Sequence, residues 1–342
     1  MKNVIKTIGI WLYILGCLVV GSVFAQDVHF TQYTATPVYV NPAMSGFHGS
    51  NYRAGANFRT QWNAVSTGNT YRTFNMFSDF ALGKPTYYSN YAGIGINFYS
   101  DQAGDLNYST NKVDLNIAYH FILDNKGTNS ISAGIQSGFG MRSIDLTNAV
   151  FANQGGGIDP LGGEAIDRER YAMFDVGMGF LWSYSPNKDR SFYLGTAMHH
   201  LNQPELSQFT SIGASDRMYA KFSVMGGMQV PVGERMHLQP SFIVNRQGPS
   251  TEINLSTLMS YSFNREPFDK NSVAFGVMYR GPLDAIALLT RVNLETLAIG
   301  FSYDVNISSL SSASRSNGGP EISLVYVGKP KNRGSERYCI PF

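Results

Sequence analysis

The chain has 342 residues, of which 15% are charged and 13% are aromatic, including 20 Tyr and 22 Phe. The many aromatic residues and a net charge of only +2 exclude an intrinsically disordered chain. After the N-terminal region no apolar run reaches the roughly 18 residues of a transmembrane helix, which excludes a helical membrane protein. The classes that remain are an outer-membrane β-barrel and a secreted β protein.

Residues 1–25 have the three parts of a secretory signal peptide. Lys2 and Lys6 form the positive region, an apolar stretch follows, and cleavage is predicted after Ala25. An uncleaved membrane anchor and lipoprotein processing at Cys17 are the alternatives.

Cleavage removes two lysines and no acidic residue, so the predicted mature chain is formally neutral. Nothing in this charge balance suggests binding to nucleic acid. Cys339 is then the remaining cysteine, and one cysteine cannot form an internal disulfide. The fold is therefore expected to be stable without disulfides.

Residues 26–50 differ from the rest of the chain. Pro37 and Asn41-Pro42 break regular structure, whereas Phe30 and Tyr33 are apolar, as are Val38 and Tyr39. Such a segment is too apolar to remain in solvent. We predict an ordered extended segment that folds into the barrel and plugs its lumen.

Residues 51–328 alternate between apolar and small or polar side chains with a period of two, which is typical of β-strands. In 171–184 the apolar residues share one face, the small and polar residues share the other, and Leu181 is the exception. The same alternation occurs in 113–121 and 296–305. About fourteen strands are predicted, near 51–62, 70–80, 91–100, 108–122, 130–144, 171–185, 190–200, 217–230, 236–246, 251–263, 272–280, 283–291, 294–305 and 320–328.

The alternation alone fits a soluble sandwich as well as a membrane barrel, because both have one apolar face. Two features favour a transmembrane antiparallel β-barrel. The polar faces contain Gly, Ser, Ala and Asn rather than Lys and Glu, which suits a crowded lumen, and aromatic residues occur near strand ends, as in interfacial girdles.

The predicted connections also favour a barrel, because bacterial barrels alternate short periplasmic turns with longer outer loops. The short turns are 124–127, 185–188 and 231–234, and the longer connections are 145–170, 201–216 and 306–319. The short connection near Gly281-Pro282 and the long one at 81–90 do not follow this rule.

The sequence offers few candidates for catalytic or metal chemistry. Adjacent residues on a strand point to opposite faces, so His199-His200 is expected to be a polar pair at a strand end rather than a metal site. Loop 155–167 has carboxylates for calcium, but their spacing fits no known loop pattern. Gly93-Ile94-Gly95 lacks the third glycine of a dinucleotide site and is predicted to be small, lumen-facing residues. We therefore predict no enzyme, no cofactor and no metal.

Short motifs occur along the whole mature chain. They are Phe30-Thr31-Gln32-Tyr33, Pro37, Asn41-Pro42-Ala43, Gly46, Arg59-Thr60-Gln61-Trp62, Ser100-Asp101-Gln102-Ala103-Gly104-Asp105, Arg142-Ser143-Ile144-Asp145, Phe151-Ala152-Asn153-Gln154, His199-His200-Leu201-Asn202-Gln203-Pro204, Gln247-Gly248-Pro249, Tyr279-Arg280-Gly281 and Glu321-Ile322-Ser323-Leu324. In this order they resemble the PorP/SprF family, outer-membrane proteins of the type IX secretion system of Bacteroidetes.

The resemblance implies a role in protein secretion, cell-surface attachment or gliding motility. It implies two kinds of partner, a secreted adhesin-like protein with a type IX sorting domain and components of the periplasmic secretion ring. The candidate partner or plug contacts are the motif residues Gln32, Tyr33, Asn41, Pro42, Arg59, Gln61, Trp62, His199, His200, Gln203, Pro204, Gln247, Gly248 and Pro249.

We expect four parts, a signal peptide (1–25), a plug segment (26–50), an outer-membrane barrel (51–328) and a basic C-terminal tail (329–342). A plugged barrel favours docking or anchoring of a secreted protein, because a folded passenger cannot pass through it. The alternatives are a diffusive porin or small-solute transporter, which needs an open lumen, and a purely structural outer-membrane protein without cargo.

Overall fold

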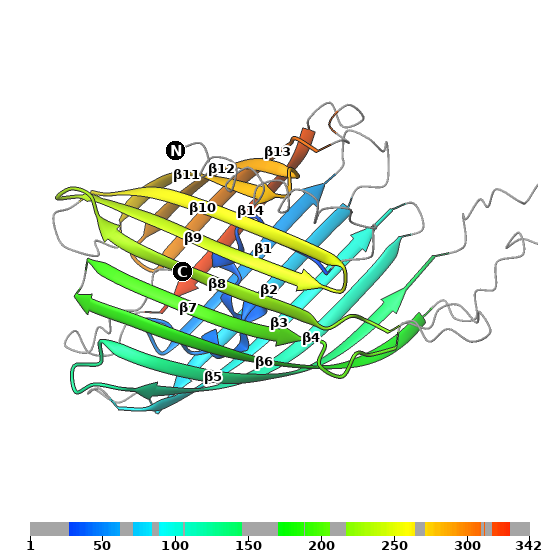
Figure 1. Ribbon diagram of the computed structural model, residues 1–342, viewed down its shortest axis with the longest axis horizontal. Helices are drawn as coiled ribbons and strands as arrows, with labels where there is room; N and C mark the ends of the chain where they lie inside the picture. Colours follow the sequence, from blue (N-terminus) through cyan, green and yellow to red (C-terminus); the bar gives the residue numbers. More distant parts are fainter. Residues whose placement is uncertain are drawn as a thin grey trace, which may run out of the picture.

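The computed structural model describes residues 27–61, 71–83, 89–104, 107–145, 170–187, 189–205, 217–263, 271–308, 311 and 317–328. Within them fourteen antiparallel strands form one closed barrel, in which each strand pairs with its neighbours in the chain and β1 pairs with β14 (Figure 1). Closure removes the two free edges that an open sheet would have. The predicted antiparallel barrel of about fourteen strands is confirmed.

The strands are β1 (Tyr52–Gln61), β2 (Tyr71–Leu82), β3 (Tyr91–Ala103), β4 (Tyr108–Ile122), β5 (Asn129–Ser143), β6 (Arg170–Asn187), β7 (Arg190–His199), β8 (Lys221–Pro231), β9 (Met236–Gln247), β10 (Ser250–Ser262), β11 (Ser272–Gly281), β12 (Ala285–Leu294), β13 (Leu297–Asn306) and β14 (Asn317–Val327). All fourteen predicted segments are found, with ends that differ by a few residues at most.

The two faces of the wall have opposite chemistry. On β5 the outward side chains of Ile135 and Phe139 are 62% and 58% exposed, and the outward residues of β4 are likewise large and apolar. The inward residues Asp114, Asn116 and Asp175 are buried, all at 1% exposure or less. An apolar exterior around a polar interior is the arrangement of a membrane barrel and the reverse of a soluble protein. No helix among the described residues is long and apolar enough to cross a membrane.

Consecutive strands place their connections at alternate ends of the barrel. We call the end with connections 144–169 and 200–220 the loop end, and the end with connections 123–128, 188–189 and 232–235 the turn end. The predicted alternation of short and long connections holds for these five, but 104–107 and 248–249 are short at the loop end and 263–271 is long at the turn end. Both predicted exceptions are present too, since 282–284 is a short connection at the loop end and 83–90 is a longer one at the turn end.

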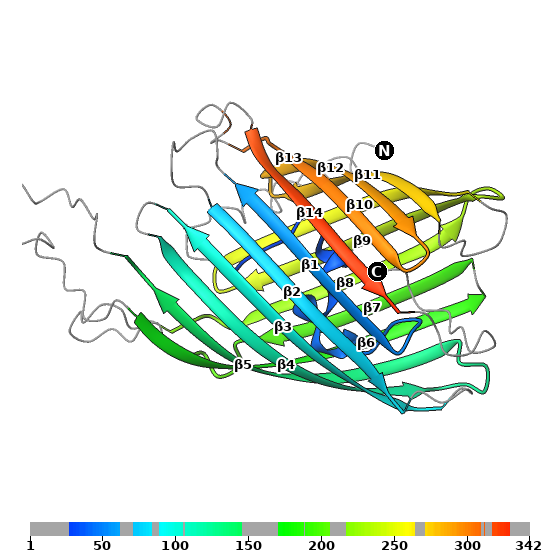
Figure 2. The same ribbon diagram turned by 180° about the vertical axis from the view of Figure 1, so that it is seen from behind.

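Residues Asp27–Ser50, the lumen segment, lie inside the barrel, where both side views show them in blue behind the wall (Figures 1 and 2). At one end of the segment, Asp27 bonds to Gln247 at the loop end of β9. At the other, Gly46 bonds to Asp79 near the turn end of β2. The segment therefore crosses the lumen from the loop end to the turn end before β1 begins.

The lumen segment is not extended throughout, which differs from the expectation. It contains three short turns, η1 (Tyr33–Ala35), α2 (Pro37–Val40) and η2 (Pro42–Met44). Pro37 and Pro42 stand at the start of α2 and η2, where a proline ring already has the helical φ angle and the missing N–H is not needed. The prolines thus start turns rather than only interrupting regular structure.

The hydrophobic core lies in the lumen, between the segment and the wall. Val40, Met44 and Phe47 of the segment pack in one cluster with wall residues such as Leu181 and Met225. Leu181, which broke the alternation of β6, is 1% exposed. Its apolar side chain points inward because the lumen segment, and not water, covers it.

Glycines on the inner wall make room for the segment. A Cβ atom on Gly134 of β5 would stand 2.5 Å from the backbone N of Ala43, and one on Gly93 of β3 would overlap the carbonyl of Ser45. Side chains are therefore excluded where the two backbones touch. This confirms that Gly93 and Gly95 are small, lumen-facing residues, whereas Ile94 between them lies on the other face of β3.

Candidate functional site

The interface between the lumen segment and the barrel wall is the candidate functional site, because it brings together most of the predicted motif residues. Glu321 of β14 holds the start of the segment. Its two carboxylate oxygens accept the backbone N–H groups of Thr31 and Gln32, both at 2.8 Å, and the side-chain amide of Asn57 at 2.9 Å. The Gln32 side chain in turn donates to the backbone carbonyl of Glu321 at 3.0 Å and accepts from Ser323 at 2.7 Å.

Arg59 of β1 and Arg280 of β11 share one carboxylate at the same place. Their guanidinium groups each lie 2.7 Å from Oδ2 of Asp304 on β13. Arg59 also donates to the backbone carbonyl of His29 at 2.6 Å, and Arg280 donates to the Thr31 hydroxyl at 2.7 Å. All three charged side chains are buried, so their attraction is weakly screened and their bonds to the segment are charge-assisted.

The two adjacent histidines both point inward, which corrects the expectation of opposite faces. His199 is the last residue of β7, and His200 has a φ of 57°, a left-handed conformation that turns the chain after the strand. His199 Nδ1 contacts Gln136 and its Nε2 contacts the carbonyl of Val40. The pair therefore contacts the lumen segment rather than a metal, and no metal-binding group of His, Cys, Asp and Glu occurs in the described parts of the chain.

His200 joins the first described residue of the segment to β6. Its Nε2 lies 2.6 Å from Asp27 and its Nδ1 lies 3.0 Å from Asp175. Burial alone would lower the pKa of His200, but these two carboxylates raise it to about 9. Burial alone would raise the pKa of Asp27, but His200 and Lys221 lower it well below its usual range. The imidazolium is thus held between two carboxylates.

Asn41 is the central anchor of the segment and is fully buried. Its Oδ1 accepts from the backbone N–H of Ala43, which caps η2. Its Nδ2 donates to the carbonyls of Phe180 on β6 and Thr196 on β7, at 3.1 and 3.2 Å. Pro42 is buried beside it, where η2 packs on β4, β5 and β6.

The remaining contacts go to other parts of the wall. Tyr33 donates its hydroxyl to Ser241 of β9 at 2.8 Å. Arg53 of β1 binds Asp79 of β2 through two hydrogen bonds, of 2.9 and 3.0 Å, and also donates to the carbonyl of Met44. His120 of β4 contacts the carbonyl of Ser45 at 2.9 Å. The segment is therefore bonded to strands all around the barrel.

The other predicted residues take different places. The side-chain oxygen of Gln61, with its amide oriented to satisfy both groups, faces the Arg59 guanidinium. Gln247 accepts from the backbone N–H of Asp27 at 2.9 Å, whereas Gly248 and Pro249 form the turn after β9, in which Gly248 is half-buried and Pro249 is exposed.

Gln203 lies outside the site. It is exposed in the turn that follows His200, with a φ of 45°. Pro204 is buried, and its carbonyl accepts from the backbone N–H of Met218. Trp62 lies outside the described residues, as does loop 155–167 with its carboxylates.

Sequence reasoning missed several charged residues of the wall. Lys112 binds Asp114 and Asp175, with Nζ–O distances of 2.8 and 2.5 Å, and Arg53 pairs with Asp79. Each is an ionisable residue at an inward position of an alternating strand. A charged side chain at an inward position needs a buried partner. Charged residues at such positions could therefore have been recognised in the sequence as one set of paired residues.

No curated protein matches the sequence. Among solved structures, the toluene transporter TbuX of Ralstonia pickettii is similar, with a TM-score of 0.49 and 12% identity over 85% of this chain and 92% of that one. The monoaromatic hydrocarbon channel CymD has a TM-score of 0.49 and 10% identity over 92% of this chain and 96% of that one. Scores and identities at this level say nothing about what this chain binds.

The family comparison is far more specific. The model of the type IX secretion system membrane protein PorP/SprF matches residues 22–326. This range contains the whole lumen segment and all fourteen strands of the barrel, with the single exception of Val327. The resemblance read from the ordered motifs is confirmed, and the chain belongs to the PorP/SprF family of type IX secretion system membrane proteins.

Proposed function

We propose that this chain is a plugged outer-membrane barrel that docks or anchors a secreted surface protein, or links it to the periplasmic secretion ring. In this proposal the chain reaches the outer membrane after signal-peptide cleavage near Ala25 and catalyses no reaction. The secreted partner carries a type IX sorting domain. These roles go beyond membership of the family, which gives the secretion system but not the task within it.

One observation carries the proposal, namely that the lumen segment is bonded around the wall. Its contacts reach β14 and β13 through Thr31, β6 and β7 through Asn41, and β1 and β2 through Met44 and Gly46. A folded passenger cannot share a lumen that is already filled. Docking at an end of the barrel needs no such passage, and it therefore fits the filled lumen better than conduction does.

We place the partner contacts at the two ends of the barrel. At the loop end the candidates are the connections 145–170 and 201–216, and at the turn end the candidate is the tail 329–342. The tail contains Lys329, Lys331, Arg333 and Arg337 and one acidic residue, Glu336, so an acidic component of the secretion ring would complement it. Deleting 329–342 should leave the barrel folded and stop surface delivery, whereas unchanged delivery would exclude the tail.

The test is a mild-detergent purification of the tagged protein from native outer membranes, followed by mass spectrometry. We expect a large secreted protein with a sorting domain, or ring components, to co-purify. A tagged, unrelated outer-membrane barrel from the same cells is the control for non-specific capture.

The competing porin function is measured on the same preparation in planar bilayers. We expect little conductance from the wild-type barrel and a large increase after residues 27–50 are deleted. A barrel that purifies alone and conducts steadily without the deletion would overturn the docking proposal.

A further inference from the structure

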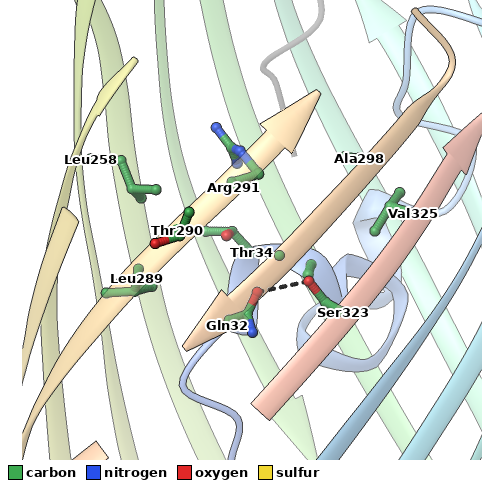
Figure 3. A pocket seen from close by; sticks show the side chains of 11 residues that line it. Gln32, Thr34, Leu258, Leu289, Thr290, Arg291, Ala298, Ser323 and Val325 are labelled. Carbon is green, nitrogen blue, oxygen red and sulfur yellow. Dashed lines mark hydrogen bonds between the residues drawn. The ribbon is translucent and has the colours of Figure 1, made fainter. Parts of the chain in front are cut away.

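A cavity remains between the lumen segment and the wall, beside Arg291 of β12. It has a volume of about 30 Å³ and is lined by residues of the segment and of β10, β12, β13 and β14 (Figure 3). A single water needs roughly 10–15 Å³ by the same kind of measure, so the cavity has room for two waters or one small polar group. On one side of it, Ser323 bonds to Gln32, as the dashed line in Figure 3 shows.

Arg291 differs from the lumen cations that hold the segment. Arg53, Arg59 and Arg280 each have a carboxylate within 4 Å, as do Lys112 and Lys221. Arg291 makes no ion pair with any described carboxylate, and its Nη2 donates to Gln239 at 2.5 Å. Its buried Nε has no hydrogen-bond partner, as is also true of Arg142 and Arg280, so the missing carboxylate is what distinguishes Arg291 from Arg280.

Arg142 also has no described carboxylate within ion-pair distance, but its guanidinium lies against the hydroxyls of Tyr108 and Tyr171, at 3.3 and 3.5 Å. Arg291 has no such phenol oxygens around it, and it borders a cavity. The Arg291 side chain as a whole is half-buried, but its Nε–H is buried, and a buried donor is costly unless an acceptor reaches it. The combination of an unused donor and an adjacent space therefore points to a ligand.

We propose that this cavity binds a single carboxylate, whose oxygens accept from the Arg291 guanidinium. One positive charge balances one negative charge, and no acidic residue lines the cavity. Leu258, Leu289, Ala298 and Val325 form apolar walls, which suit the aliphatic carbon next to a carboxylate and disfavour a multiply charged phosphate. Arg291 lies three residues before the turn end of β12, so the cavity belongs to the half of the lumen nearer that end.

The test uses the mature full-length barrel in detergent at constant ionic strength, with chloride as the background anion. Acetate is the probe, and the melting temperature is followed over a range of acetate concentrations. We expect a saturable rise in melting temperature and no comparable rise with phosphate. The same measurement is repeated with a glutamyl tripeptide whose N-terminus is acetylated and whose C-terminus is amidated, so that its carboxylate is that of the glutamate side chain. Binding of the peptide would assign the carboxylate to a protein partner, and binding of acetate alone would assign it to a small metabolite; either result supports the site.

Two variants test the assignment by different routes. Arg291→Gln removes the charge, and Ala298→Leu fills the cavity while keeping Arg291. Each should weaken acetate binding at least about tenfold, because a hydrogen bond to a charged group is lost or its space is occupied. Arg217→Gln is the matched control, since Arg217 is 56% exposed and pairs only with Glu205 among the described carboxylates.

Folding of each variant is checked by its faster migration on gels before boiling, so that loss of binding and loss of fold are distinguished. Acetate binding that is unchanged in folded Arg291→Gln would overturn the site. Equal stabilisation by phosphate and acetate would overturn the carboxylate class. Neither result would bear on the docking proposal, which depends on co-purification of partners.

Discussion

Replacing Glu321 by Gln should release the start of the lumen segment from the wall. The carboxylate accepts three hydrogen bonds of 2.8 to 2.9 Å, two of them from the backbone of Thr31 and Gln32. The amide has the same shape but keeps one acceptor oxygen, and its NH₂ group would face donors. Because Oε1 accepts from both Gln32 and Asn57, an amide oxygen in that place keeps those two bonds, and the bond from Thr31 is lost at a cost of about 1.5–3 kcal/mol. This cost would raise the undocked fraction by roughly one to two orders of magnitude.

Thiol labelling measures that fraction. Thr36 is fully buried in the segment, so a Thr36→Cys probe in a Cys339→Ser background reacts with a maleimide only when the segment leaves the wall. We expect Glu321→Gln to accelerate labelling at least about tenfold, while Glu205→Gln, at an exposed position, leaves the rate unchanged. A rate within twofold of the parent, in a barrel that is still folded, would refute the view that Glu321 holds the segment.

Three further predictions test the lumen packing, the charges and the exterior. Gly134→Val should displace η2 and raise bilayer conductance, because its Cβ would stand 2.5 Å from the backbone of Ala43; Gly233→Ala, which meets only Met236 at 3.7 Å or more, should not. The pKa of His200 is raised from 6.5 to about 9, so its stabilisation of about 3 kcal/mol is complete below pH 6.5 and is lost as the pH rises to 9. The urea concentration at the unfolding midpoint should therefore fall between pH 6 and 10. In His200→Asn this pH dependence should be absent. Ile135→Arg, on the outer wall, should cost about 2–4 kcal/mol of folding free energy in lipid, measured by urea titration, with little effect in the thiol assay.

The positions of the strands could be predicted because strand periodicity is a local property. Alternation along 113–121 and 296–305 already separates outward from inward residues, and the structure keeps that separation. Phe30, Tyr33 and Val38 are buried as their apolar character predicts. The division into signal peptide, plug, barrel and tail stays a prediction at both ends, because residues 1–26 and 329–342 lie outside the described part of the chain.

The partners of the motif residues could not be predicted in the same way, because they are far away in the sequence. Thr31 meets Glu321 across 290 positions and Asn41 meets Phe180 across 139. Only closure of the barrel brings such residues together, since it fixes which inward positions face the same part of the lumen.

The sequence by itself determined the alternating strands, the number of strands, the apolar exterior and the family, since each follows from residue types in order along the chain. The tertiary structure alone decided which partner each buried charged side chain has. The left-handed turn at His200 brings both histidines inward. The lumen segment reaches Asp304 and Glu321 because β14 pairs with β1 and β13 lies next to β14. The physical reason is that side-chain alternation depends on local geometry, whereas burial of a charge is tolerated only where distant strands supply its partner.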